Sequence, residues 1–213
     1  MTVDQVGLPL TTSSGAALGS YLQAVDALLA GRTDVESHAT RAVQEDEGMA
    51  MAWLVLGLQR RMVGRVPEAT ELIQRVIERS SGVSEREAGV LRFFDLFVGQ
   101  DIPAAERVAV EHLRRYPRDH LVVMYVHFLY NLMLRSVDRR ERHHALAREL
   151  APSWGDDWYL LASLAFVETE AGNHGRARDL AERSLAVRPE CGGAAHAMAH
   201  ALLETGAIAE GIA

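Results

Sequence analysis

Residues 165–190 read AFVETEAGNHGRARDLAERSLAVRPE, and this stretch decides the fold. It opens with an apolar helical pattern, reaches the turn-forming pair Gly172-Asn173, and continues into a second helical pattern that Pro189 ends. The second pattern places small and apolar residues on one face, at Ala177, Leu180, Ala181 and Leu185. Small side chains let two helices approach closely, so the stretch predicts an antiparallel helix pair.

Prolines that end a helical pattern recur along the chain. Pro117 and Pro152 are 35 residues apart, and Pro152 and Pro189 are 37 apart. A two-helix unit of roughly 34 residues is typical of tetratricopeptide repeats. The spacing of the prolines therefore predicts a solenoid in which successive helix pairs stack side by side.

A second window resembles the same repeat. Residues 53–57 read WLVLG and residues 69–73 read ATELI. The tetratricopeptide pattern has a tryptophan and a Leu-Gly pair in its first helix, then an alanine and an aromatic residue in its second. Here Ile73 replaces the aromatic residue, Arg60 stands where tyrosine is usual, and Ser81 stands where proline is usual.

Helical periodicity and stop signals predict an all-α chain of about eleven helices. We expect them near residues 16–30, 34–47, 50–63, 67–79, 84–98, 103–115, 119–135, 138–150, 155–171, 175–187 and 192–206. No run alternates between apolar and polar residues over strand length, so we expect no strand. Residues 1–15 form an N-terminal extension, and residues 16–213 form a single tetratricopeptide-like solenoid domain.

The C-terminal end of this pattern is unfinished. A further helix is expected to begin at Ile208, but it reaches Ala213 before it can bury an apolar face. Solenoids normally finish with a polar capping helix. We therefore expect either that the domain is truncated and continues in a longer protein, or that another surface covers this end.

Three blocks together resemble the tetratricopeptide repeat protein 38 family. They are GLPLTTSS at residues 7–14, SEREAGVLRFFDLFVGQDIPAAERVAVEHLRRYPRD at 84–119, and RARDLAERSLAVRPE with AAHAMAH at 176–200. Members of that family are roughly twice as long, so the resemblance implies that this chain is the N-terminal half. The family brings no established activity. Where it has A-H-x-x-E, this chain has Leu203 and carries its glutamate one place later, at Glu204.

Composition excludes several classes of function. Hydrophobic residues make up 48% of the 213 residues, which argues against disorder, and the formal charge of −7 disfavours nucleic acid as a partner. Cys191 is the only cysteine, so an internal disulfide and a cysteine-based zinc knuckle are excluded. The N-terminus lacks the features of a secretory signal, and the apolar stretch 121–134 is too short to span a bilayer. We expect a cytoplasmic protein with no membrane or nucleic-acid partner.

The strongest candidate site is the series His196, His200 and Glu204. At about 100° per residue, these side chains share one stripe some 80° wide. They are expected to face solvent or the inner surface of the solenoid, where solenoids bind ligands. Two histidines four residues apart can share a divalent transition metal, and Glu170, one repeat earlier, could add an oxygen ligand. The alternative is a polar face on which Glu204 pairs with His200. The apolar stripe of this helix is expected at Ala195, Met198, Ala199 and Leu202.

The most apolar predicted helix, residues 119–135, contains two tyrosines and a histidine–asparagine pair that could carry a function. Tyr125 and Tyr130 could point into the concave face as a partner surface, or they could pack in the core with satisfied hydroxyl groups. His127 and Asn131, one turn apart, are of a kind that is usually hydrogen-bonded within a core.

These features predict a binding protein. The first hypothesis is an interaction scaffold for a protein or peptide partner, with no cofactor and no catalytic residue, since the sequence carries no glycine-rich phosphate loop, serine elbow or paired-carboxylate motif. The alternative is a metal- or small-molecule-binding protein, or an enzyme, that uses His196, His200 and Glu204. The unfinished last helix also favours self-association.

Overall fold

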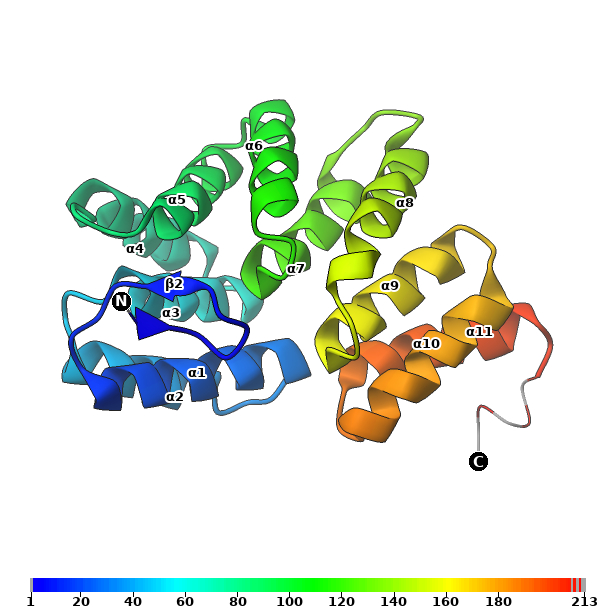
Figure 1. The fold of residues 1–213 in the computed structure, drawn as a ribbon. Coiled ribbons are helices and arrows are strands. Elements are labelled where there is room, and N and C mark those ends of the chain that lie inside the picture. Colours follow the sequence, from blue (N-terminus) through cyan, green and yellow to red (C-terminus); the bar gives the residue numbers. More distant parts are fainter. Residues whose placement is uncertain (1, 208, 210, 212–213) are drawn as a thin grey trace. The chain divides into compact units, whose positions relative to one another are not determined.

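The computed structural model describes residues 2–207, 209 and 211, and it is built almost entirely of helices (Figure 1). In chain order they are α1 (Gly15–Ala30), α2 (Val35–Glu45), α3 (Ala50–Met62), α4 (Val66–Arg79), α5 (Glu85–Val98), α6 (Ile102–Arg115), α7 (His120–Phe128), α8 (Arg139–Leu150), α9 (Trp158–Glu170), α10 (His174–Val187) and α11 (Gly192–Glu204). A π-helical segment, η1, spans Leu129–Met133, and a short 3-10 helix, η2, spans Ala151–Ser153.

The predicted fold class is confirmed. Adjacent helices pack against one another as pairs, as in an α-solenoid, and the described residues form the expected eleven α-helices. No helix among the described residues is long and apolar enough to cross a membrane. The helix expected to begin at Ile208 falls mostly on residues outside the described ones.

The chain divides into two compact units, one up to His112 and the other from Leu113 onward. We call them the N-terminal unit and the C-terminal unit, and each is described by itself. The N-terminal unit contains α1 to α5 and most of α6, and the C-terminal unit contains α7 to α11. The single solenoid domain over residues 16–213 stays a prediction.

In the N-terminal unit, the tetratricopeptide-like window places a glycine where two helices touch. Gly57 of α3 faces Ile73 of α4, and a Cβ atom at Gly57 would lie 2.7 Å from Cγ1 of Ile73. Ala69 and Ile73 are fully buried. Gly57 of the Leu-Gly pair and Ala69 of the second helix are both small, and both therefore allow α3 and α4 to pack in close contact.

The N-terminal segment contains a hairpin that the sequence reading did not predict. Strands β1 (Thr2–Val3) and β2 (Pro9–Leu10) pair antiparallel, so the expectation of no strand was wrong here. The carboxylate of Asp4 closes the turn by accepting hydrogen bonds from the backbone N–H groups of Val6 and Leu8. Strands of two residues are too short to show an alternating pattern.

A capping box is present at the start of α5, and its glutamate has a second partner. The Ser84 side chain accepts a hydrogen bond from the Glu87 N–H, and the Glu87 carboxylate accepts one from the Ser84 N–H at 2.9 Å. The same carboxylate, fully buried, accepts a hydrogen bond from the Thr11 N–H at 3.0 Å. The GLPLTTSS segment is thereby bound to the N-terminus of α5.

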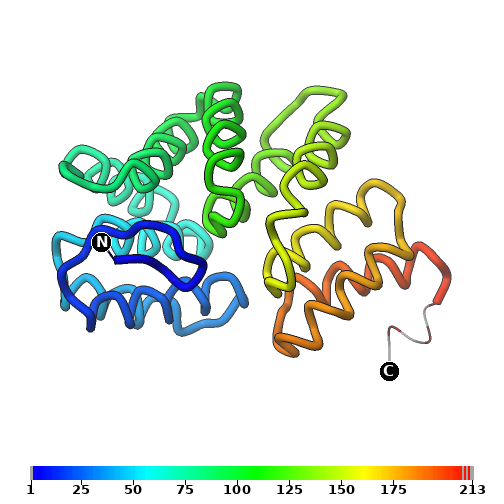
Figure 2. Tube along the Cα trace, viewed as in Figure 1, coloured from blue at the N-terminus to red at the C-terminus, as the bar shows by residue number. Residues whose placement is uncertain are grey.

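The three helix ends that the prolines predict are confirmed. Helices α6, α8 and α10 each end two residues before a proline, at Pro117, Pro152 and Pro189 respectively. Figure 2 follows the chain from α9 through a tight turn into α10 and then into α11. Helix α9 packs against α7, α8, α10 and α11, so it touches every other α-helix of the C-terminal unit.

The helix expected over residues 119–135 is not continuous. Helix α7 ends at Phe128 and η1 follows, with the Leu134 N–H donating to the Leu129 carbonyl at 2.8 Å. The Asn131 side chain donates to the His127 carbonyl at 2.9 Å. A π-helical turn holds one extra residue, which side-chain periodicity over so short a stretch cannot reveal, and such turns frequently lie at functional sites.

Asp157 connects α7 with the start of α9. Its carboxylate caps α9 by accepting hydrogen bonds from the N–H groups of Tyr159 and Leu160, both at 3.1 Å. It also lies 2.9 Å from Nε2 of His120 and 3.6 Å from Arg118. Burial by itself raises the pKa of this carboxyl. The hydrogen bond and charge of His120, together with a backbone hydrogen bond and Arg118, outweigh that effect, so the net pKa lies below its ordinary value.

Candidate functional site

The predicted His/Glu stripe lies on α11 and outside the core. His196 and Glu204 are exposed and His200 is half-buried. The ring centroids of His196 and His200 are 4.6 Å apart, as their four-residue spacing on one helix requires. Among the described residues, no hydrogen bond or ion pair joins Glu204 to either histidine, so the Glu204–His200 pairing stays a prediction.

The apolar stripe of α11 differs from the one we expected. Ala195 and Ala199 are exposed, and Met198 is only half-buried. Alanine occurs all around this helix, so composition alone does not single out a buried face, and packing against α9 and α10 selects it. The buried residues are Ala194, Ala197, Ala201 and Leu202.

Aromatic contacts extend the histidine stripe across two more helices. The ring of Phe166 on α9 lies edge-on to His196, with centroids 5.8 Å apart. Phe166 also meets His127 of α7, with centroids 6.0 Å apart and planes at 89°. We call His127, Phe166, His196 and His200 the ring row. It joins three helices, α7, α9 and α11.

Sequence reasoning did not single out Phe166. Its signal was nevertheless present, because Phe166 and His200 are separated by 34 residues, one repeat length. Residues one repeat apart occupy equivalent positions on successive first helices. A search for aromatic or histidine residues at that spacing from His200 would have found it.

His127 is the most unusual member of the ring row. The residue as a whole is half-buried, but both ring nitrogens are shielded from solvent and have no hydrogen-bond partner among the described residues. Burial lowers the pKa of His127 to about 4, because the charged imidazolium would lose its hydration there. The ring is therefore neutral at pH 7.

A second histidine supports His127 from α8. His143 is buried, and its ring centroid lies 4.8 Å from that of His127 and 4.8 Å from that of Tyr130, on which it stacks. Burial, with the nearby charges of His127 and His144, holds the pKa of His143 far below its ordinary value. The two imidazoles thus form a neutral pair beneath the surface of the ring row.

Tyr125 and Tyr130 do not form the partner surface that we considered. Their exposed fractions are 2% and 3%, so both rings belong to the core. The ring centroids of Tyr125 and Phe128 are 5.5 Å apart, and the ring of Tyr130 stacks on His143 of α8. The stacking of Tyr130 is a contact between helices, which periodicity does not report.

Glu170 follows Phe166 by one turn of α9, so the two side chains share a face of that helix. Its carboxylate forms an ion pair with Arg140 of α8 at 3.3 Å. The described residues contain no group of three or more histidine, cysteine, aspartate or glutamate side chains placed to hold a metal. A metal site of His196, His200 and Glu204, with Glu170 as a further ligand, stays a prediction.

A buried carboxylate fixes the position of α9 under the ring row. Glu168 is fully buried and lies 3.0 Å from Nε2 of His144, 2.9 Å from Nε of Arg176 and 2.6 Å from the Asn173 side chain. Burial raises the pKa of Glu168, but these partners, Asn173 first, lower it to a net value below the ordinary one. The carboxylate is therefore ionised and ties α8 and α10 to α9.

Comparison with known proteins adds no family to this description. No protein-family model matches the chain, and no curated protein matches it significantly.

Proposed function

We propose that the C-terminal unit binds a polypeptide partner along the ring row. The observation that supports this proposal is a continuous series of ring contacts across three helices, with centroid separations of 4.6 Å, 5.8 Å and 6.0 Å. His196 is exposed, and Phe166 and His200 are half-buried, so part of the row is open to a partner. First helices of successive pairs form the ligand-binding surface of many solenoids.

The chemistry of the row suits an apolar anchor flanked by polar groups. The phenyl ring of Phe166 offers apolar area at low entropic cost, and the imidazoles of His196 and His200 can each donate and accept hydrogen bonds. The Arg140–Glu170 ion pair adds charged groups of both signs to the side of the row. Interfaces of this kind concentrate binding energy in a few aromatic residues.

The unpartnered nitrogens of His127 also support a functional surface. A buried polar group without a hydrogen bond costs about 1–3 kcal/mol, and native proteins rarely keep one without a reason. Local rules are most often broken at functional sites. His127 breaks the rule that buried polar groups are hydrogen-bonded, and it does so next to Phe166 of the ring row.

Peptide selection tests this proposal directly. A displayed library of random peptides is selected against the full chain, and the dissociation constant of the selected peptides is then measured for variants. Phe166→Ala and His196→Ala are each expected to weaken binding by about tenfold or more, because both rings contact the anchor. Asp179→Ala, at an exposed position on α10, is the matched control and is expected to change nothing. Binding that ignores both ring substitutions would refute the proposal.

The geometry of α11 also favours a second candidate, a divalent metal site. The imidazoles of His196 and His200 project from successive turns of one helix, with centroids 4.6 Å apart, and Glu204 is one turn further on. Zinc in proteins is held mostly by histidine, cysteine and carboxylate ligands. On this hypothesis the two imidazoles supply two of the four ligands, and the Glu204 carboxylate has to move toward them to supply a third, since the described residues hold no group of three such ligands already placed for a metal.

Zinc titration of the full chain separates the two candidates. If the metal site exists, calorimetry is expected to show one zinc ion per chain, and elemental analysis of the purified protein should detect the metal. The double substitution His196→Ala with His200→Ala should abolish binding, whereas His174→Ala, on α10, should leave it intact. A wild-type protein that binds no zinc, and whose melting temperature zinc does not change, would eliminate the metal site while leaving the peptide hypothesis standing.

A further inference from the structure

A separate cavity lies within the N-terminal unit. Its volume is about 300 Å³, and its walls come from α3, α4, the segments that precede α3 and follow α4, and the N-terminal segment. The residues that matter most are Glu47, Trp53, Leu72, Val76 and Arg79. Ligand pockets in proteins begin at about this size, so the cavity suits a small ligand.

One side of this cavity is apolar and held in place. The indole N–H of Trp53 donates to the Glu47 carbonyl at 2.9 Å, which fixes the ring as a wall. Val76 is buried and Leu72 is half-buried, and both line the cavity from α4. This side can cover a branched aliphatic group of modest size.

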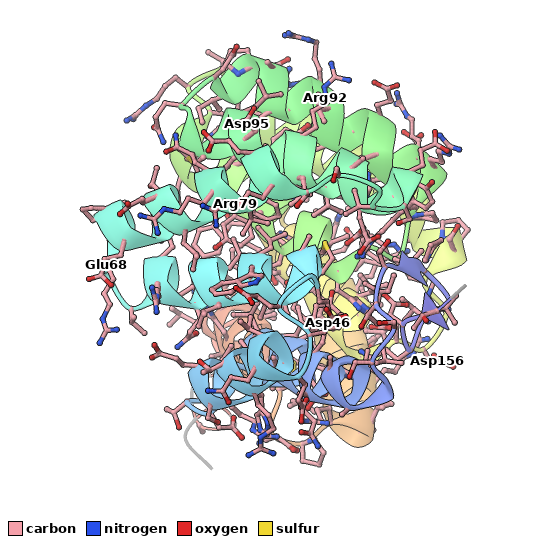
Figure 3. The ribbon with its side chains drawn as sticks, turned by 90° about the vertical axis from the view of Figure 1, so that its left-hand side faces the viewer. Asp46, Glu68, Arg79, Arg92, Asp95 and Asp156 are labelled. Carbon is pink, nitrogen blue, oxygen red and sulfur yellow. The ribbon has the colours of Figure 1, made fainter. Side chains whose placement is uncertain are left out.

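Positively charged side chains line the cavity from the C-terminal end of α4. Arg75 also lines the cavity, but it forms an ion pair with Glu71. The guanidinium of Arg79 forms no hydrogen bond or ion pair with any described residue. Figure 3 shows Arg79 on this unit, together with Arg92 of the next helix, α5. Arg79 is therefore the cation that a ligand can use.

The cavity does not suit a multiply charged anion. Glu47 also lines it, and the carboxylate of this residue has no partner among the described residues. A phosphate with two negative charges would be repelled by Glu47, whereas a single carboxylate matches the planar fork of one arginine. Charge and shape together select a monoanion attached to an apolar group.

We propose that this cavity binds a monocarboxylate with a branched aliphatic body, held by Arg79 at its carboxylate and by Trp53, Leu72 and Val76 at its apolar end. Two sources share this chemistry, a free short-chain acid and the C-terminal residue of a peptide. The proposal does not rest on the ring row, because the cavity belongs to the N-terminal unit and contains none of its residues.

Nuclear magnetic resonance of the tryptophan indole groups in the full chain provides the test. The chain has three tryptophans, and only Trp53 lines the cavity, so Trp53→Phe assigns its signal while the other two serve as internal references. We expect 4-methylpentanoate to shift the Trp53 signal saturably, and 4-methylpentanamide, its uncharged counterpart, to have little effect. The peptide Gly-Ser-Gly-Leu with a free C-terminus tests the second source. A saturable shift with it assigns a peptide end, and a shift with the free acid alone assigns a small molecule.

Substitution of the arginine completes the experiment. Arg79→Gln is expected to weaken binding of 4-methylpentanoate at least about tenfold, the value of one lost charge-assisted hydrogen-bond pair. Arg92→Gln, at an exposed position outside the cavity, is the matched control and should leave the affinity unchanged. The proposal is overturned if neither carboxylate shifts the Trp53 signal, if the amide shifts it equally, or if Arg79→Gln binds as well as the wild type.

Discussion

Replacing Asp157 with alanine is expected to lower the free energy of unfolding by about 3 kcal/mol. The side chain caps α9 through two backbone N–H groups, and the loss of such a cap costs about 0.5–2 kcal/mol. It also accepts a hydrogen bond from the buried ring of His120, and hydrogen bonds to charged groups contribute about 1.5–3 kcal/mol. Both interactions disappear together, and the ring nitrogen of His120 is left buried without its partner.

The neighbouring residue offers a matched control. Asp156 is exposed and its one ion pair, with Arg183, lies at the surface, where such pairs contribute about 0–1 kcal/mol. Urea unfolding of Asp156→Ala is therefore expected to follow the wild type closely, while Asp157→Ala unfolds at clearly lower urea. Equal midpoints for the two variants would show that Asp157 does not connect α7 with α9 in solution.

Acidification is expected to destabilise the protein by about 3 kcal/mol through His127 alone. The pKa of this ring is about 4 in the folded state, against about 6.5 in an unfolded chain. Above pH 6.5 both states are neutral and the folded protein keeps its full stability. As the pH falls from 6.5 to 4, the unfolded chain binds a proton that the folded protein does not, so stability decreases by about 1.4 kcal/mol per pH unit. His143, whose pKa is also lowered, acts in the same direction.

His127→Leu separates this effect from general acid denaturation. The variant is expected to lose about 3 kcal/mol less than the wild type between pH 6.5 and 4, and to be more stable than the wild type at pH 7 by about 1–3 kcal/mol. The gain at pH 7 arises because two unpartnered buried nitrogens are removed. His196→Leu, at an exposed ring, is the control and should keep the wild-type pH dependence. If the free energies of unfolding of the wild type and His127→Leu change with pH in parallel, the lowered pKa of His127 is contradicted.

The prediction for His127 connects stability with the proposed binding surface. A residue that costs stability at pH 7 and contacts Phe166 is expected where binding, rather than packing, has selected the side chain. His127→Leu should therefore gain stability and lose peptide affinity, and denaturation and binding measurements on one preparation can check both.

Much of the site was not accessible from the sequence. His196, His200 and Glu204 could be placed on one stripe because helix geometry alone sets the angle between residues four apart. Phe166 and His127 join that stripe only through contacts between helices. Tyr125 and Tyr130 looked equally available in the sequence, yet both are buried, with Tyr130 stacked on His143 of α8.

The cavity beside Trp53 shows the same limit. The repeat pattern identifies Trp53 as a packing residue, and Arg79 reads as an ordinary basic residue in the last turn of a helix. Neither suggests a binding site by itself. The cavity exists because the segment before α3 and the segment after α4 come together over the apolar side of α4.

By itself the sequence determined that the chain folds into paired helices and where most of them begin and end, with the exception of the end of α7. Local physics is sufficient for those features: apolar side chains recur with the helical period, prolines end helices because they lack an N–H group, and Gly57 permits close approach. The tertiary structure alone decided which face of α11 is buried, that His127 is neutral and unpartnered, and which rings adjoin. Burial and ring contact depend on atoms that are distant in the chain, and these are brought together only when the pairs pack.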